Sequence, residues 1–198
     1  MNLSLHFDKG TVLLYGAEKH QLHFLNGLSW DERTNCLRAP AAEYRKLVTD
    51  LRKHKITYND NARKFSAVTF PLKKKITPRS FQTEAAEAWI SEKRGVVSLP
   101  TGAGKTILAV MLIARIGRPT LIHVPTIDLM GQWNDVLNEY FDIKIGLLGG
   151  GINDIQLITV ATYDSALLHV PYRGDQFGLL VFDECHHLPG EQFKFTAM

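Results

Sequence analysis

Hydrophobic and polar positions follow one pattern in the first third of the chain and another in the rest. In the first third, short apolar runs such as LSLHF and TVLLY are separated by turn-forming residues at 8–10. This arrangement predicts a β-hairpin. The runs QLHFL at 21–25 and KFSAVTF at 64–70 have the same strand character. The first third therefore contains several short predicted strands.

A single amphipathic helix is predicted between these strands, over PAAEYRKLVTDLRKHK at residues 40–55. Pro40 suits the first turn of a helix, and Tyr44, Leu47 and Leu51 recur at helical spacing on one face. The strands and this helix together predict a small α+β domain over residues 1–70. The charged, proline-bounded segment PLKKKITP at 71–78 is the predicted linker.

After the linker, helical and strand patterns alternate. Helices are predicted over 80–93, 106–117 and 126–141, and strands over 95–99, 120–125, 155–162 and 177–184. Ser80 and Thr126 are the expected N-caps, and Gly117 ends the second helix. The strands are nearly continuous in Val, Ile and Leu, which indicates a parallel sheet covered by helices on both faces. Residues 79–198 are therefore predicted to form an α/β domain.

Composition adds an asymmetry of charge. The chain has 198 residues, is 45% hydrophobic and carries a net charge of +3. Residues 1–77 carry 14 Lys and Arg against seven Asp and Glu, a net charge of +7, and the remainder carries −4. The basic part either faces a polyanion or has an ordinary solvated surface. Five aromatic residues among the basic ones fit either a DNA-reading surface or, for most of them, a small core: Phe7, Tyr15, Phe24, Trp30 and Tyr44.

No stretch of the sequence is long and apolar enough to span a bilayer, and the N-terminus lacks a signal-peptide pattern. The two cysteines do not make a disulfide framework, so a reducing interior is expected. These features predict a protein of the cytoplasm, or of the nucleus in a eukaryote.

The segment LPTGAGKT at residues 99–106 predicts a phosphate-binding loop between a strand and a helix. Gly102 and Gly104 allow the backbone amides to approach an anion, Lys105 reaches the β- and γ-phosphates, and Thr106 offers a hydroxyl to Mg²⁺. The candidate nucleotide-binding residues here are Pro100, Thr101, Gly102, Ala103, Gly104, Lys105 and Thr106. The alternative is a plain glycine-rich turn, but a turn has no need for Lys105 and Thr106 together. The strict motif has a glycine where Leu99 stands.

The stretch FGLLVFDECHHLPG at 177–190 supplies the acids that such a loop requires. Asp183 is placed at the end of an apolar strand to bind the Mg²⁺ shell, and Glu184 follows it to polarise the attacking water. A zinc site is a weaker interpretation, because Cys185, His186 and His187 are adjacent and their side chains diverge.

GAGKT and DECHH together resemble the motifs of superfamily 2 DExH-box helicases. RSFQTEAAEAW is similar to their Q-motif region, with Gln82 matching the glutamine that reads adenine and Arg79 close by. HVPTIDLMGQW at 123–133, LLGGG at 147–151 and VATYDSAL at 160–167 resemble the strand-contacting motifs. Leu99 is the form usual in these helicases. The resemblance implies a RecA-like lobe that uses ATP and Mg²⁺, with His186 coupling ATP to strand movement.

Within this superfamily, LSWDERTNCLRAPAAEYRKLVTDLRK at 28–53 resembles the segment that joins a small N-terminal module to the first lobe in archaeal and bacterial members of the XPB family. In that family the module is described as a DNA-damage recognition domain. Membership implies ATP-dependent 3′–5′ unwinding or translocation on DNA in nucleotide excision repair, with a nuclease partner in archaea. Motor subunits of restriction enzymes share the lobe and are the alternative.

The sequence reaches FKFTAM at 193–198 without the family's next motif, Ser/Thr-Ala-Thr, or a second RecA-like lobe. The expectation is an N-terminal half that binds ATP without useful turnover or unwinding. Two further alternatives stay open: a DNA-binding module without turnover, and a general ATPase that does not use nucleic acid. Gln82 and the segment at 123–133 argue against the general ATPase.

Overall fold

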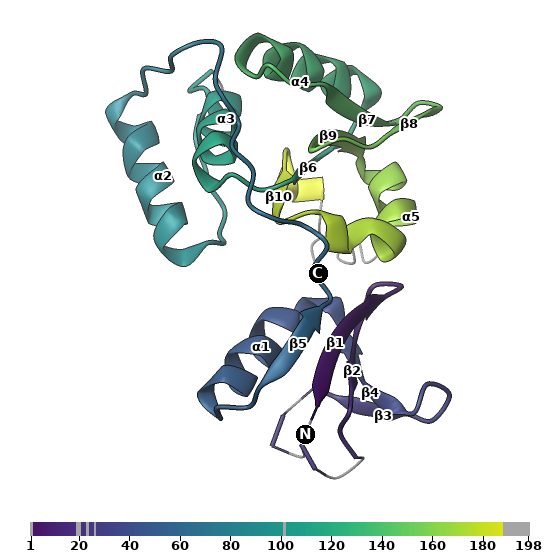
Figure 1. Cartoon of the computed structure of the whole chain (residues 1–198). Coiled ribbons are helices and arrows are strands. Elements are labelled where there is room, and N and C mark those ends of the chain that lie inside the picture. The colour runs from purple at the N-terminus through teal and green to yellow at the C-terminus, as the bar shows by residue number, and fades with distance from the viewer. Residues whose placement is uncertain (1, 19–20, 23, 26, 101, 188–198) are drawn as a thin grey trace. The chain divides into compact units, whose positions relative to one another are not determined.

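A computed structural model of the chain describes residues 2–18, 21, 22, 24, 25, 27–100 and 102–187 (Figure 1). Its contacts separate two compact units. The N-terminal unit contains the described residues up to 65, together with 163–177, 186 and 187, and the phosphate-loop unit contains 66–162 and 178–185. The division thus falls before the predicted linker at 71–78.

The N-terminal unit is built on a five-stranded sheet in the order β3-β4-β2-β1-β5. Strands β1 (Leu3–Asp8) and β2 (Thr11–Tyr15) form the predicted hairpin, and Lys9 and Gly10 take the positive φ angles of its two-residue turn. β4 (Cys36–Pro40) pairs antiparallel with β2 and with β3 (Ser29–Asp31), and β5 (Tyr58–Asn61) runs parallel to β1.

The predicted amphipathic helix is confirmed as the 3₁₀ turn η1 (Ala41–Glu43) followed by α1 (Tyr44–Lys53). Its apolar face buries Leu47, Val48 and Leu51 in a core shared with the inward side chains of β1 and β2. Its basic residues remain exposed at its C-terminal end, where the helix dipole favours cations. Helix α5 (Tyr163–Arg173) and η2 (Gly174–Gln176) also belong to this unit, where Lys64 forms an ion pair of 2.7 Å with buried Asp175.

Two predicted strands are wrong. Residues 21, 22 and 24 lie in turns, the amide of Leu25 donates to the carbonyl of Leu22 at 2.9 Å, and both leucines are buried. Residues 64–70 have no strand either, because Val68 donates its amide to the carbonyl of Gly117 at 2.8 Å, at the end of a helix. Both segments contain apolar residues because they cover a core, and no neighbouring strand bonds to them.

The phosphate-loop unit is built on a second sheet, in the order β10-β6-β9-β7-β8. Strands β10 (Leu179–Phe182), β6 (Thr120–Val124), β9 (Ile158–Thr162) and β7 (Ile145–Gly149) are parallel, and β8 (Ile152–Asp154) pairs antiparallel with β7. Every residue of β6 and β9 is buried, which explains their continuous apolar sequence. The predicted α/β class with a mostly parallel sheet is confirmed.

Three helices accompany this sheet: α2 (Ser80–Glu92), α3 (Lys105–Ile116) and α4 (Ile127–Tyr140). Thr126 caps α4 as predicted, its hydroxyl accepting from the amide of Leu129 at 3.2 Å, and Gly117 ends α3 with a φ of 59°. Arg79, one residue before the predicted Ser80, is the N-cap of α2. Helices α3 and α4 pack against each other and share one core with the strands. None of the helices in the described ranges is long and apolar enough to cross a membrane.

The predicted strand at 95–99 is absent, although its side chains alternate as in a strand. Val97 and Leu99 pack with buried residues of α2 and α3, and the intervening Ser98 is exposed. Val96 is 79% exposed. The segment is therefore extended chain lying on helices. Alternation reports which face is buried, but a strand also requires a partner for its backbone hydrogen bonds.

The predicted linker lies against the end of α4. Leu72 forms an isolated bridge with buried Phe141, and Lys73 donates its amide to the carbonyl of Tyr140 at 2.8 Å. Lys74 pairs with Glu139 at 2.6 Å on the surface. These contacts give the segment a fixed place in the phosphate-loop unit.

Candidate functional site

The predicted phosphate loop leads directly into the N-terminus of α3. Gly104 is the N-cap of this helix with a φ of 81°, and Gly102 has a φ of 77° with no atom within 4 Å of where a Cβ would stand. Lys105 is exposed and Thr106 partly buried, in the first two positions of the helix. Thr101, also predicted to bind nucleotide, lies outside the described residues. The start of α3 thus combines open space, backbone amides and a cation, which suits an anion.

Gln82 lies beneath this loop and is 5% exposed. Its amide nitrogen donates to the carbonyls of Ala103 at 3.1 Å and Gly104 at 3.2 Å, and its amide oxygen accepts from the amide of Arg79 at 2.9 Å. A Cβ on Gly104 would stand 2.7 Å from that nitrogen. Gln82 therefore joins the first turn of α2 to the phosphate loop. The sequence analysis selected this residue for its resemblance to an adenine-reading glutamine, and nothing in the sequence signalled these contacts.

The two acids follow β10, and they differ in environment. Asp183 is partly buried and donates its amide to the carbonyl of His123 at 2.9 Å, which continues the pairing between β10 and β6. Glu184 is exposed and has a φ of 52°, so the chain turns away from the sheet there. Helix α3 contacts β10. The structure therefore brings the helix that starts at Lys105 against the strand that ends beside Asp183.

The carboxylate of Asp183 accepts a hydrogen bond on each of its oxygens. The indole Nε1–H of Trp133, from α4, donates to Oδ2 at 2.8 Å, and the amide of Glu184 donates to Oδ1 at 3.1 Å. Trp133 is 4% exposed within the main core. Trp133 is the last residue of the segment 123–133, which resembles a strand-contacting motif, and no contact with Asp183 was predicted for it.

His123, the first residue of the same segment 123–133, also lies in this region, and no individual role was predicted for it. It lies fully buried in β6, its Nδ1 is 3.3 Å from the carbonyl oxygen of Val181, and its ring stacks on Phe182 at 4.3 Å. Burial lowers the pKa of His123 to about 4, so the ring is neutral at physiological pH. A histidine within the apolar run TLIHVP is the only signal that could have marked it.

The remaining candidate residues lie in η3 (Cys185–His187), a 3₁₀ turn. Cys185 is partly buried and His186 is exposed. Among the described residues, no three His, Cys, Asp or Glu side chains are grouped so as to hold a metal ion.

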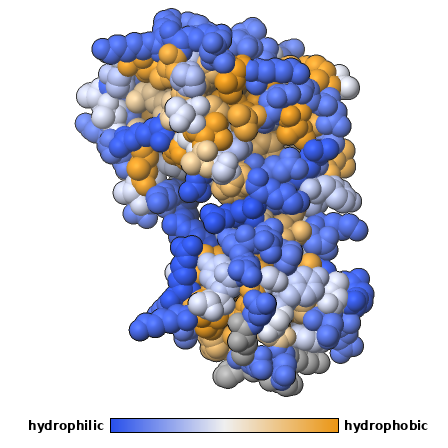
Figure 2. All heavy atoms as spheres, in the orientation of Figure 1, coloured by the Kyte–Doolittle hydropathy of each residue, from blue (hydrophilic) through white to orange (hydrophobic). Residues whose placement is uncertain are grey.

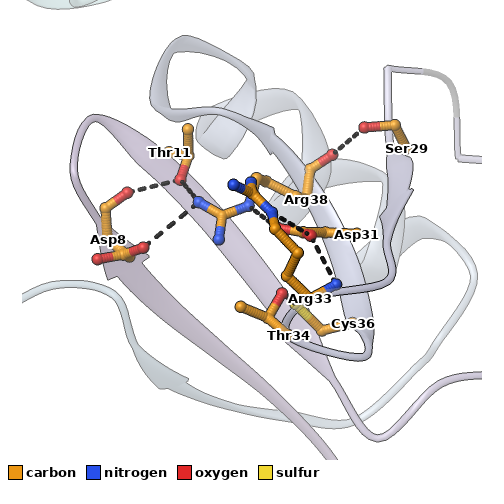
Figure 3. A network of polar contacts seen from close by, with 8 residues as sticks. All are labelled: Asp8, Thr11, Ser29, Asp31, Arg33, Thr34, Cys36 and Arg38. Carbon is orange, nitrogen blue, oxygen red and sulfur yellow. Dashed lines mark hydrogen bonds and ion pairs between the residues drawn. The ribbon is translucent and has the colours of Figure 1, made fainter.

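The N-terminal unit contains a separate polar network, centred on Arg38 (Figure 3). The Arg38 guanidinium donates to Oδ2 of Asp31 at 2.8 Å and to Oγ1 of Thr11 at 2.7 Å, and it pairs with Asp8 at 3.4 Å. Hydrogen bonds from Arg33 lower the pKa of Asp31 to about 2. The positive charges of Arg33 and Arg38 are thus already balanced by carboxylates of the same sheet.

Comparison with known proteins finds two family models that match different parts of the chain. A family model described as "Type III restriction enzyme, res subunit" matches residues 75–197, and one described as "Xeroderma pigmentosum group B helicase damage recognition domain" matches residues 5–62. These matches cover the two parts that the sequence patterns had distinguished.

Among similar proteins, "DNA 3'-5' translocase XPB2" of Sulfurisphaera tokodaii is 42% identical over 172 residues, which are 86% of this chain and 39% of the relative. "DNA 3'-5' helicase XPB" of Mycobacterium tuberculosis is 33% identical over 130 residues, 60% of this chain and 24% of the relative. The chain thus spans well under half the length of either relative.

Among solved structures, the UvsW helicase from bacteriophage T4 matches with a TM-score of 0.55 and 18% identity, over 99% of this chain and 87% of that chain. A hypothetical ATP-dependent RNA helicase from Sulfolobus tokodaii matches with a TM-score of 0.50 and 23% identity, over 62% of this chain and 41% of that one. At these identities the likeness concerns the fold alone.

Proposed function

The chain belongs to the family of the type III restriction enzyme Res subunit and, among superfamily 2 DExH-box helicases, to the XPB family, and we propose that it is the ATP-binding part of a DNA translocase with 3′–5′ polarity. The observation that carries this proposal is the phosphate loop on α3, together with the contact of that helix with the strand ending at Asp183 and Glu184. The match of residues 5–62 to the damage recognition domain favours this function over that of a restriction-enzyme motor.

The residues of the loop fit a nucleoside triphosphate with Mg²⁺. Gly102 provides open space beside the backbone, and the amides at the start of α3 face an anion with the helix dipole behind them. The Thr106 hydroxyl and the Asp183 carboxylate are oxygen ligands of the kind that Mg²⁺ prefers. Bound Mg²⁺ would neutralise charge on the phosphate oxygens.

Two charged side chains complete the proposed chemistry. Lys105, exposed at the first position of α3, stabilises the negative charge of the β- and γ-phosphates. Glu184 is also exposed and follows Asp183 directly, so we assign to it the orientation of the attacking water and the acceptance of its proton. His186 is assigned to the coupling of ATP to strand movement.

DNA is the proposed track. The neighbouring strands β10, β6, β9 and β7 are all parallel, so their carboxyl ends lie at one edge of the sheet. Residues 125 and 126 follow β6 at this edge, and Gly150 and Gly151, which follow β7, have positive φ angles. Exposed backbone of this kind can approach phosphates closely. We propose that both segments contact the tracked strand.

The N-terminal unit is proposed as a second DNA contact. In the balanced Arg38 network the cations are already paired, whereas Arg45, Arg52, Lys53 and Lys55 are exposed on α1 or just after it. Hydrophilic residues predominate on the face of the chain seen in Figure 2. These exposed cations, rather than Arg33 or Arg38, are therefore the proposed contacts to a DNA backbone.

A salt titration tests this assignment. Reversal of one exposed cation, Lys53→Glu, should weaken binding of the chain to duplex DNA and reduce the slope of log affinity against log salt by roughly one per lost phosphate contact. Lys75→Glu, the same reversal outside the N-terminal unit, is the matched control. A salt slope equal in the two variants would contradict the proposal.

The whole protein is proposed to act in nucleotide excision repair, with a second RecA-like lobe and a nuclease as partners. A DNA-tracking protein works in the compartment that holds the DNA, which is the cytoplasm in an archaeon or bacterium. We propose that this chain binds ATP but lacks useful turnover without the second lobe, whose arginines stabilise transition-state charge in related hydrolases. Strong DNA-stimulated ATPase activity from the 198-residue chain would contradict that last statement.

The central test is Lys105→Ala, with Lys75→Ala as an exposed control in the same unit. The change should abolish binding of a fluorescent ATP analogue to this chain and ATP hydrolysis by the full-length protein, while the control retains both. Retention of ATP binding by Lys105→Ala would show that the phosphate loop is wrongly assigned. If DNA leaves the ATPase rate of the full-length protein unchanged, the chain is a general ATPase instead.

A further inference from the structure

The hydrogen bond between Trp133 and Asp183 joins residues 50 positions apart in the chain. It is 2.8 Å long, it is made by a donor that is 4% exposed, and its acceptor is the carboxylate assigned to Mg²⁺. The indole Nε1–H can only donate, so the Asp183 carboxylate is the acceptor of this hydrogen bond. A buried N–H group that lacks an acceptor destabilises the folded protein, so the indole and the Asp183 carboxylate stabilise the fold as a pair.

Trp133 is itself held rigidly. It lies on α4 between buried Met130 and Leu137, and the cap at Thr126 fixes the start of the same helix. Its ring has only two rotatable bonds, and the surrounding core restricts both. The position of the Nε1–H group is therefore set by the packing of α4.

The second oxygen of the same carboxylate is also held. The amide of Glu184 donates to Oδ1 at 3.1 Å, and the amide of Asp183 itself donates to the carbonyl of His123 at 2.9 Å. One donor on each oxygen fixes the plane in which the carboxylate lies. Because a carboxylate has about four lone-pair directions, a donor on each oxygen restricts the orientation in which it can meet a metal ion.

We propose that Trp133 is a positioning residue for nucleotide hydrolysis: its indole holds the Asp183 carboxylate in the orientation that receives the Mg²⁺ of the bound nucleotide. This inference rests on the proposed function of the phosphate loop. Partners that orient a metal ligand typically affect metal affinity or activity by about 10- to 100-fold when they are removed. The indole accordingly affects the Mg²⁺ concentration needed for ATPase activity, whereas the phosphate loop determines the affinity for the nucleotide.

The first test needs neither metal nor turnover. The chain has three tryptophans, at 30, 89 and 133. Their indole ¹H–¹⁵N resonances can be assigned by single Trp→Phe changes in the 198-residue chain. Asp183→Asn should move the Trp133 resonance upfield, because a hydrogen bond to a neutral acceptor is weaker, and should leave Trp30 and Trp89 in place. A Trp133 resonance unchanged by Asp183→Asn would overturn the proposal.

The second test uses the full-length protein. Trp133→Phe should raise the Mg²⁺ concentration for half-maximal ATPase about 10- to 100-fold, while the KM for ATP at saturating Mg²⁺ changes less than about threefold. Excess Mg²⁺ should restore kcat. Trp89→Phe is the matched control, because Trp89 lies on α2, packs against the same core and should leave the Mg²⁺ dependence unchanged. Equal Mg²⁺ dependence in the two variants would overturn the proposal.

Two further variants separate the possible failures. Replacement of Trp133 by benzothienylalanine keeps the ring shape and removes only the N–H donor, so a loss of Mg²⁺ affinity in this protein cannot come from poor packing. If Lys105→Ala leaves ATP hydrolysis intact, the proposed function of the phosphate loop fails. The effect of Asp183→Asn on the Trp133 resonance is measured without nucleotide, so it tests the hydrogen bond separately.

Discussion

The contact between Gln82 and the phosphate loop leads to a prediction about stability without nucleotide. Gly104 has a φ of 81°, and a Cβ added there would stand 2.7 Å from the amide nitrogen of Gln82. That nitrogen donates to the carbonyls of Ala103 and Gly104. Gly104→Ala should therefore both strain the backbone and push the Gln82 amide away from the loop. In a Gln82→Ala background, the Cβ added by Gly104→Ala no longer meets the Gln82 amide, and only the backbone strain remains.

The expected magnitudes follow from these contacts. Gln82→Ala removes its hydrogen bonds to the loop and to the amide of Arg79, at about 1 kcal/mol net for each group lost, or about 2 kcal/mol. Gly104→Ala adds about 1–2 kcal/mol for a left-handed non-glycine residue and displaces the amide nitrogen, about 3 kcal/mol in all. The double variant should lose about 3–4 kcal/mol, which is 1–2 kcal/mol less than the sum of the single losses.

Urea unfolding in the absence of nucleotide measures this coupling. A Trp30→Phe background leaves Trp89 and Trp133 as fluorescent reporters, and both lie in the phosphate-loop unit. Gly102→Ala is the control, since its φ of 77° carries the same strain but its Cβ would meet open space, so its loss should add to that of Gln82→Ala. Additive losses for Gly104→Ala and Gln82→Ala, within about 0.5 kcal/mol, would refute the reasoning. No loss on Gln82→Ala would show that Gln82 serves the nucleotide alone.

Three further predictions concern the rest of the fold. Burial and the hydrogen bond to Asp60 raise the pKa of Tyr44 above its usual 10. The contribution of Tyr44 to stability should therefore be present below pH 10 and be lost as the pH rises further. Tyr44→Phe should flatten this alkaline dependence of the free energy of unfolding, measured with urea. Thr126→Ala removes the N-cap of α4 and should lower the free energy of unfolding by about 1 kcal/mol, against no loss for Thr126→Ser. Arg115→Ala breaks an exposed ion pair with Glu87, at 2.5 Å, and should leave that free energy nearly unchanged because solvent screens the pair; a clear loss in urea unfolding would show that the pair stabilises the packing of α3 on α2.

The elements that sequence analysis predicted correctly are those whose pattern has a local cause. The helix 106–117 and the strand 120–125 are recognisable because their own side chains bury themselves, and Gly117 and Thr126 mark ends through their own backbone. The segment 95–99 shows what this reasoning omits. Its side chains alternate because Val97 and Leu99 lie on α2 and α3, while strand structure depends on hydrogen bonds with a partner that the local sequence does not specify.

Some residues of the candidate site can also be located from the local sequence, whereas others depend on contacts with distant parts of the chain. Reactive side chains at strand ends could be located from sequence, because parallel strands expose their carboxyl ends at one edge, and Asp183 follows such a strand. The groups that orient those side chains could not, because they look like core. Trp133 lies on the apolar face of α4 beside Met130 and Leu137, and its one polar atom is what reaches Asp183. A residue that packs like a core residue and donates like a site residue leaves the hydrophobic pattern unchanged, so only the three-dimensional contact distinguishes it. The orientation of the proposed Mg²⁺ ligand can thus depend on the packing of a helix whose buried face looks like ordinary core.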